Sequence, residues 1–134
     1  MSNDAHNQSV FDIVGAEFFV RLVDAFYDGV QNDQVLIPLY PEGEDTIGAR
    51  HRLALFLIQY WGGPDTYMEE RGHPRLRMRH APYVIGELER DHWLLHMATA
   101  IESVIGDVSE THREYVTTEL ATYMVNAAEA MRNQ

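Results

Sequence analysis

The sequence predicts a single all-α domain, and three observations support this prediction. Apolar residues recur at intervals of three and four along most of the chain, which is typical of amphipathic helices. No segment alternates apolar and polar residues over a convincing length, so strands are not expected. The 134 residues are 46% hydrophobic and 23% charged, which is enough for one buried core. We expect residues 1–134 to form one domain, with residues 1–10 as a flexible N-terminal extension.

The first long helix is expected over residues 15–30, and Asn32-Asp33 should end it. Its apolar stripe consists of Phe19, Val23, Phe26, Tyr27 and Val30. In the stretch that follows, Pro38 and Pro41 flank Tyr40 and disfavour a regular helix.

A second helix is expected over residues 46–61, because Gly62-Gly63-Pro64 is a strong stop signal. Its stripe consists of Ala49, Leu53, Phe56 and Tyr60, and Leu57 widens it. Residues 65–73 are polar and are expected to be irregular. Residues 74–81 favour a short helix with proline in its first turn, and Pro82 limits its continuation.

Two more long helices complete the predicted fold. Residues 84–105 carry apolar side chains on more than one side, which predicts a buried central helix. Asp107 is expected to cap the last helix, because Glu110 follows three residues later as in a capping box. That helix should run to about Met131, and its inward residues are expected to be Tyr115, Val116, Leu120, Tyr123, Met124, Ala127 and Met131.

The composition excludes several classes of protein. The absence of cysteine excludes disulfides, thiolate metal sites and cysteine nucleophiles. Residues 1–8 lack the apolar core of a signal peptide, and no apolar run approaches the ~20 residues of a membrane span. The net charge of -11 should repel nucleic acid and anionic lipid. We therefore expect a soluble cytoplasmic protein with no nucleic-acid partner and no membrane span.

The basic residues are all arginines, and four of them fall within nine positions: Arg71, Arg75, Arg77 and Arg79. A local basic patch on an acidic protein suggests that a small anionic group binds there. The alternative is an ordinary solvated face of ion pairs, and composition alone favours it.

His80 stands out among seven histidines because it lies near the end of the short helix, directly after the arginine run. A neutral imidazole there can bind haem iron, while nearby cations can meet the two propionates. A structural histidine is the alternative. His92 and His96 share a helix face but show no third metal ligand, so helix packing or the surface is favoured for them. His6 and His112 are expected at the surface.

Tyr27, Tyr40 and Trp93 lie in otherwise apolar neighbourhoods. A buried tyrosine hydroxyl or indole N–H needs a hydrogen-bond partner. Each could bond a backbone carbonyl, or the three could share a polar ligand inside an apolar cavity. Periodicity does not choose between these two interpretations.

Several motifs resemble those of the group II truncated haemoglobins, most closely the actinobacterial members. The two longest are Gln59-Tyr60-Trp61-Gly62-Gly63-Pro64 and Arg71-Gly72-His73-Pro74-Arg75-Leu76-Arg77-Met78-Arg79-His80-Ala81-Pro82. Shorter ones are Ala25-Phe26-Tyr27, Tyr40-Pro41-Glu42 and Glu89-Arg90-Asp91-His92-Trp93-Leu94. The similarity spans nearly the whole chain. It departs from the family at Val14-Gly15, where a glycine pair is usual, and in the turn after Tyr40, which is one residue longer.

The resemblance implies a two-over-two helical sandwich around one haem b. It implies that His80 is the proximal iron ligand and that Tyr27, Tyr40 and Trp93 surround the bound gas. Ala49 falls where other globins often carry a distal His or Gln, and Leu53 would wall the distal pocket. Arg79, and with it Arg77, is expected to meet a haem propionate.

These expectations lead to a haem protein that binds O₂ and releases it slowly, because donors in a dry pocket stabilise a partly negative ligand. Such a pocket also suits nitric oxide dioxygenation or peroxide chemistry, which would need a reductase. The expected partners are therefore O₂, NO and CO, with a monomer or homodimer as the assembly. The alternative function is a haem-free helical interaction module.

Overall fold

The computed structural model describes residues 8–40, 43 and 45–134, and for Arg77 the backbone alone. All regular structure in this part of the chain is helical. The α-helices are α2 (Val10–Val30), α3 (Ile47–Tyr60), α4 (Thr66–Arg71), α5 (Leu76–His80), α6 (Glu87–Val104) and α7 (Glu110–Met131). Two 3₁₀ turns, η1 (Ile37–Leu39) and η2 (Ile105–Asp107), lie between them.

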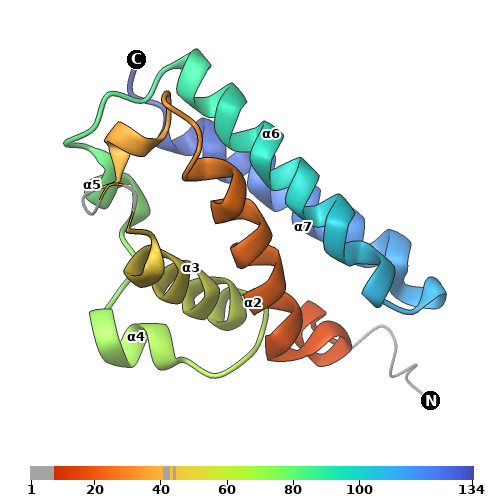
Figure 1. Cartoon of the computed structure of the whole chain (residues 1–134). Coiled ribbons are helices and arrows are strands. Elements are labelled where there is room, and N and C mark those ends of the chain that lie inside the picture. The colour runs from red at the N-terminus through yellow and green to blue at the C-terminus, as the bar shows by residue number, and fades with distance from the viewer. Residues whose placement is uncertain (1–7, 41–42, 44) are drawn as a thin grey trace.

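The four long helices form a two-over-two sandwich, which confirms the predicted fold class. Helix α2 lies between α3 on one side and the pair α6 and α7 on the other (Figure 1), and it makes its most extensive contacts with α6 and α3. The short helix α5 packs against α7. Three phenylalanines of α2, Phe18, Phe19 and Phe26, are at most 1% exposed and form the centre of the core.

Helix α2 begins five residues earlier than the sequence predicts. Ser9 caps it through a capping box, in which Ser9 Oγ accepts from Asp12 N at 3.0 Å and Ser9 N donates to Asp12 Oδ2 at 3.2 Å. Gly15 then takes a φ of 78°, which a side chain would disfavour, and kinks the helix. Residues 1–10 were expected to form a flexible extension. Residues 1–7 of it lie outside the described residues, whereas Ser9 and Val10 form the start of α2.

Helix α4 corrects the prediction that residues 65–73 are irregular. Tyr67 is 4% exposed, and its ring packs edge-on against Phe56 of α3 with centroids 5.5 Å apart. The backbone N–H of Met68 donates to Gln59 Oε1 at 2.9 Å. These long-range contacts stabilise a short helix that polar composition alone does not predict.

The start of the last helix also differs from the prediction. Asp107 ends η2, and Ser109 immediately precedes α7 without a side-chain capping bond. Tyr115, expected to face inward, is 46% exposed.

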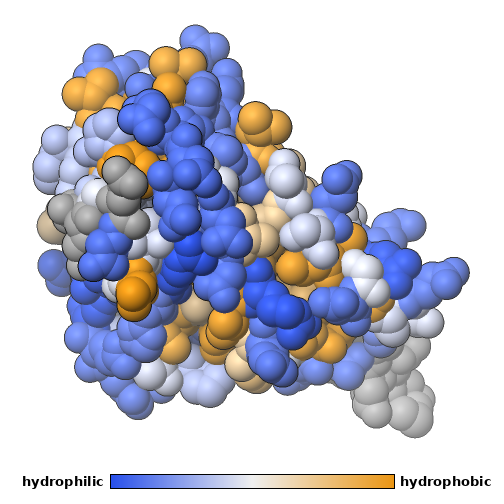
Figure 2. Space-filling view, in the orientation of Figure 1, coloured by the Kyte–Doolittle hydropathy of each residue, from blue (hydrophilic) through white to orange (hydrophobic). Residues whose placement is uncertain are grey.

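Helix α6 is less enclosed than predicted, since Leu88 and Leu95 are 56% and 64% exposed. On the face seen in Figure 2, apolar residues are scattered in small groups over a mostly hydrophilic surface. No helix in the described ranges is both long enough and apolar enough to span a membrane. The longer turn predicted after Tyr40 falls partly on residues 41, 42 and 44, outside the described residues.

Gly63 lies where the end of α3 meets the start of α2. The backbone N–H of Phe11 donates to the carbonyl of Trp61 at 3.0 Å, which ties the two helices together. A Cβ on Gly63 would lie 2.6 Å from Ile58 Cγ2 and 2.8 Å from Phe11 Cδ1. The glycine is therefore required by close packing.

Asp33 organises the turn between α2 and η1. Its Oδ2 accepts from His92 Nδ1 at 2.9 Å and from His96 Nε2 at 2.6 Å, both on α6. Its Oδ1 accepts from the backbone N–H of Val35 at 2.8 Å. Burial by itself raises the pKa of Asp33, but the hydrogen bonds from the two histidines and Val35 outweigh it and hold that pKa well below its usual range.

Replacing Gly63 by alanine should lower the free energy of unfolding by about 1–3 kcal/mol, because the added methyl overpacks the junction. Urea denaturation measures this. Gly106→Ala is the matched control, since a Cβ there meets nothing within 4 Å. Equal effects of the two substitutions would contradict the packing argument.

Asp33→Asn should lower the free energy of unfolding at pH 7 by about 1.5–3 kcal/mol, because the histidines lose a charged acceptor. Since the folded-state pKa of Asp33 is depressed, its stabilisation is present above the unfolded-state pKa of about 3.9 and is lost on further acidification. The difference in the free energy of unfolding between wild type and Asp33→Asn should therefore become smaller below about pH 4, as urea titrations at several pH values would measure.

Asp107→Asn provides the control for Asp33, because the ion pair of Asp107 with Arg21 joins side chains that are 58% and 45% exposed. Its effect should stay below about 0.5 kcal/mol. If the difference in the free energy of unfolding between wild type and Asp33→Asn does not change with pH, the carboxylate charge is not what stabilises the turn.

Candidate functional site

Three separate elements bring Tyr27, Tyr40 and Trp93 together. Tyr27 lies on α2 and is 4% exposed, Tyr40 directly follows η1, and Trp93 lies on α6. The rings of Tyr27 and Tyr40 meet edge-to-face with centroids 5.5 Å apart. Phe26 fills the space behind them, with its ring 5.0 Å from that of Tyr27 and 5.2 Å from that of Trp93.

The hydroxyl of Tyr40 is the centre of this cluster. It is hydrogen-bonded to both the Tyr27 hydroxyl and the Trp93 side chain. An indole N–H can only donate, so Trp93 donates and the Tyr40 oxygen accepts. Burial and the neighbouring Tyr27 raise the pKa of Tyr40 well above its ordinary value of 10, while the Trp93 bond opposes the rise. Tyr40 therefore keeps its proton at physiological pH.

The sequence left open a backbone carbonyl or a shared polar ligand as the partner, and for Tyr40 the structure shows a third arrangement, with side chains of the cluster as partners. The bonds to Tyr27 and Trp93 replace the backbone carbonyl that was the alternative partner. Hydroxyl protons can rotate, so the cluster can offer a donor to a small polar ligand.

Helix α3 packs across α2, the helix that carries Tyr27. Ala49 on α3 is 7% exposed and belongs to the core. Leu53, one turn further along, is partly buried and packs against the same core. Ala49 and Leu53, both expected at the distal pocket, therefore share a face of the helix that packs against α2, which carries Tyr27.

His80 is the last residue of α5 and is partly buried. Its Nδ1 lies 2.6 Å from the carbonyl oxygen of Leu76, one turn earlier. Since a carbonyl can only accept, Nδ1 carries a proton, and Nε2 is the nitrogen that holds the lone pair whenever the imidazole is neutral. A histidine oriented in this way fits the role of an iron ligand, because such ligands usually donate their second N–H to a carbonyl or carboxylate.

Arg79 braces the loop before α5. Its Nε donates to the carbonyl of Pro74 at 2.6 Å, and one terminal nitrogen donates to Arg71 and His73 carbonyls at 3.1 and 3.5 Å. These contacts support a structural role in the loop, and the expected contact of Arg79 with a propionate stays a prediction. The side chain of Arg77 lies outside the described atoms, so its expected contact with a propionate is not described either.

His92 and His96 both bond Asp33 Oδ2, which supports a role in helix packing. No set of three His, Cys, Asp or Glu side chains in the described ranges could hold a metal ion. Sequence spacing showed the two histidines on one face, but their acceptor lies about sixty positions away and was missed. Arg50 was missed for the same reason, although Asp24, Asp28 and Gln31 recur at helical spacing opposite it.

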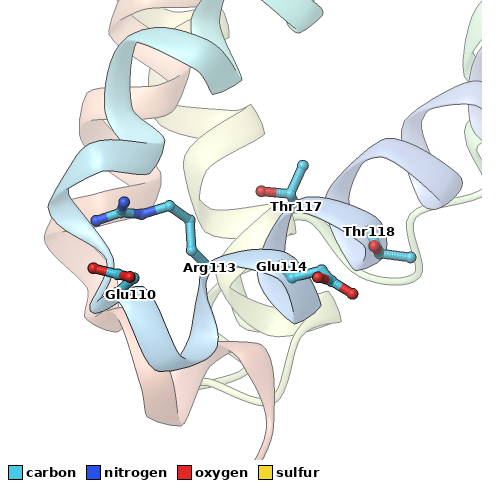
Figure 3. A pocket seen from close by; sticks show the side chains of 5 residues that line it. All are labelled: Glu110, Arg113, Glu114, Thr117 and Thr118. Atoms are coloured by element: carbon cyan, nitrogen blue, oxygen red, sulfur yellow. The ribbon is translucent and has the colours of Figure 1, made fainter.

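Two surface hollows lie away from the aromatic cluster. One, of about 380 Å³, is open and lined only by α7 residues (Figure 3): Glu110, Arg113, Glu114, Thr117 and Thr118. The other, of about 460 Å³, opens between the end of α3, Leu76 and α7, beside Tyr60, Trp61 and Tyr123. Burial raises the pKa of Tyr123 to about 12, with a further contribution from Tyr60.

Known globins match this chain along most of its length. The bacterial-like globin family model matches residues 9–129. The structure of a haemoglobin from the actinobacterium Thermobifida fusca superposes with a TM-score of 0.85 at 50% identity, covering 94% of this chain and 98% of that one. The group 2 truncated hemoglobin YjbI of Bacillus subtilis is 37% identical over 123 residues, which are 90% of each chain.

A further structure, described as a truncated oxygen-avid haemoglobin from Bacillus subtilis, has a TM-score of 0.82 at 34% identity and covers 94% of this chain and 100% of that one. The family match, the identity with group 2 relatives and the two-over-two fold agree with one another. The chain therefore belongs to the bacterial-like globin family, as a group II truncated haemoglobin, and this membership supports haem-based oxygen binding.

Proposed function

We propose that this chain binds haem b through His80 and holds O₂ beside Tyr27, Tyr40 and Trp93, with slow release. The observation that carries the proposal is the buried Tyr40 hydroxyl, which gathers three hydrogen-bonding groups from three separate elements. A few convergent polar groups inside an otherwise apolar neighbourhood are typical of a small-ligand site.

His80 supplies the first half of the site. With Nδ1 bonded to the Leu76 carbonyl, the imidazole keeps a fixed orientation and tautomer, and Nε2 is the nitrogen left to ligate iron. Bound haem would supply an iron that takes up a diatomic gas and passes electron density to it. A partly negative ligand on that iron would need hydrogen-bond donors from the chain.

The aromatic cluster supplies those donors. In a dry pocket, hydroxyl and indole protons stabilise a partly negative ligand strongly, because the pocket is already organised and little water competes. Ala49 is too small to contribute a donor, so stabilisation falls to the cluster, and Leu53 would act as a wall. Slow release suits capture, sensing or redox chemistry better than bulk transport. A relative described as oxygen-avid supports this direction.

Nitric oxide dioxygenation and peroxide reduction are extensions of the same proposal. Both need an electron donor, and a reductase is the partner class that would supply it. Sustained turnover with a reductase would distinguish an enzyme from a binder. NO and CO should occupy the same pocket as O₂. The rival function, a haem-free interaction module, predicts a colourless protein.

Titrating haem into the wild-type chain should produce a saturable Soret band and a higher melting temperature, since a bound cofactor stabilises the fold by mass action. His80→Gly should retain haem more weakly and melt lower, and added imidazole should partly restore the ferrous spectrum. His112→Gly is the matched control, because the ring of His112 bonds Ser109 at the start of α7 and does not belong to the aromatic cluster.

Two results would contradict the assignment. A wild-type chain without a saturable Soret band is not a haem protein. A His80→Gly variant that keeps the wild-type ferrous spectrum without imidazole excludes His80 as the iron ligand.

A further inference from the structure

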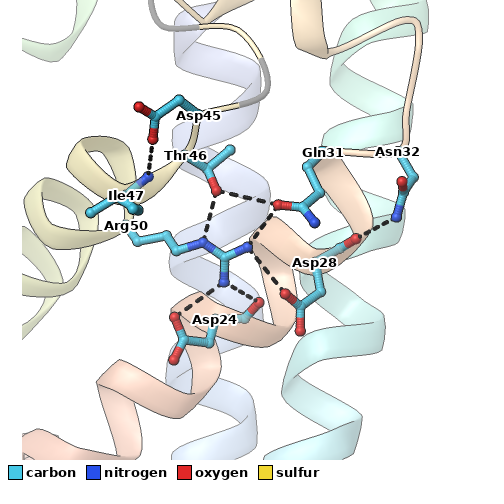
Figure 4. A network of polar contacts seen from close by, with 8 residues as sticks. All are labelled: Asp24, Asp28, Gln31, Asn32, Asp45, Thr46, Ile47 and Arg50. Carbon is cyan, nitrogen blue, oxygen red and sulfur yellow. Dashed lines mark hydrogen bonds and ion pairs between the residues drawn. The ribbon is translucent and has the colours of Figure 1, made fainter.

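Arg50, on the first turns of α3, reaches across to α2 and uses every donor direction of its guanidinium (Figure 4). Its Nε donates to Thr46 Oγ1 at 2.8 Å. Its Nη1 donates to the carbonyl and the carboxylate of Asp24 at 3.1 and 3.2 Å. Its Nη2 donates to Asp28 Oδ1 and Gln31 Oε1, both at 3.1 Å.

The contacts of Arg50 determine how α3 is oriented against α2 more than they contribute to the free energy of unfolding. The side chains of Asp24 and Asp28 are 53% and 70% exposed, so water screens both ion pairs and each is worth little. The Arg50 side chain is only 20% exposed and presents a rigid planar fork. Such a fork fixes one orientation of α3 against α2, which a flexible lysine could not reproduce.

Thr46 shows that the start of α3 depends on this arrangement. It is the one buried polar residue of the described core, at 4% exposed, and it makes no side-chain capping bond to its own helix. Its hydroxyl instead accepts from Arg50 and donates to Gln31 Oε1 at 3.4 Å. The beginning of α3, which leads into Ala49, is therefore held by α2 through Arg50.

Arg50 also contacts the ring of Tyr27, one of the three residues of the aromatic cluster. The guanidinium carbon lies 5.8 Å from the centroid of the Tyr27 ring, within the range of a cation–π contact. The same ring packs edge-to-face against Tyr40. The Tyr27 ring is thus in contact both with the Arg50 cation and with the hydrogen-bonded cluster.

We propose that Arg50 is a positioning residue for the gas site. It fixes the Tyr27 ring, and with it the Tyr27 hydroxyl, while anchoring the start of α3 beside Ala49. The proposal rests on the proposed function, because it concerns how the cluster is held when O₂ is bound. Arg50 does not itself touch the gas in this scheme.

The alternative is that Arg50 only ties two helices together. In that case its loss would loosen the fold and affect the site whether or not Tyr27 carries a hydroxyl. A double-mutant cycle separates the two, because coupling between positions appears only when one acts through the other.

The experiment compares wild type, Arg50→Gln, Tyr27→Phe and the double variant, all loaded with haem. The first measurement is the O₂ dissociation rate. The second is the ring resonance of Tyr27 in the diamagnetic CO complex of protein with labelled tyrosine, identified by its loss in Tyr27→Phe. Arg113→Gln is the control, since Arg113 on α7 donates to the carbonyls of Gly106 and Val108 in the turn before that helix.

Arg50→Gln should accelerate O₂ dissociation roughly three- to tenfold, the change expected when a partly desolvated cation–π contact is lost. The Tyr27 resonance should shift. In the Tyr27→Phe background the same substitution should change the rate less than about twofold, and Arg113→Gln should leave rate and resonance at wild-type values.

An equal acceleration in both backgrounds, or an unmoved Tyr27 resonance in Arg50→Gln, overturns the positioning role. Failure of the proposed function looks different. There, wild type takes up no haem, or Tyr27→Phe and Arg50→Gln both leave O₂ dissociation unchanged while the resonance of Tyr27 still shifts in Arg50→Gln. The resonance thus reports on the contact between Arg50 and Tyr27 independently of the O₂ dissociation rate.

Discussion

The hydrogen bonds of the buried Tyr40 hydroxyl are the constraint on which this structure depends. The residue comes from an irregular stretch, yet it must meet a tyrosine on α2 and a tryptophan on α6 at hydrogen-bonding distance. An unpaired buried hydroxyl or N–H is costly, so the three elements are held in one relative arrangement. Phe26 packs against Tyr27 and Trp93 and closes the apolar side of the cluster.

Two polar clamps hold the elements that carry this cluster. Asp33 binds His92 and His96 and thereby ties the turn that leads to Tyr40 to the helix that carries Trp93. Arg50 ties α3 to the α2 segment that carries Tyr27. The core supplies the bulk of the stability, because apolar burial is non-directional. The clamps supply direction, which a hydrogen-bonded site needs and hydrophobic packing does not give.

The spacing of apolar residues was sufficient to predict the long helices, because each of them buries a continuous apolar stripe. It failed for α4, which depends on Tyr67 meeting Phe56, and for the capping of α7, where local chemistry suggested Asp107. The family motifs led to His80, Tyr27, Tyr40 and Trp93, and the structure brings the last three together. Asp33 and Arg50 could not be predicted, since their partners lie on other helices and any surface charge has the same local pattern.

The central claim is that the Tyr40 hydroxyl organises the donors around the gas, and the O₂ dissociation rate of Tyr40→Phe tests it most directly. The substitution keeps the ring and removes only the oxygen that Trp93 and Tyr27 share. A hydrogen bond to a partly charged group is worth about 1.5–3 kcal/mol, so O₂ dissociation should accelerate roughly ten- to a hundredfold, at least as much as in Trp93→Leu, with CO dissociation changing less. A wild-type O₂ dissociation rate in Tyr40→Phe would contradict the account.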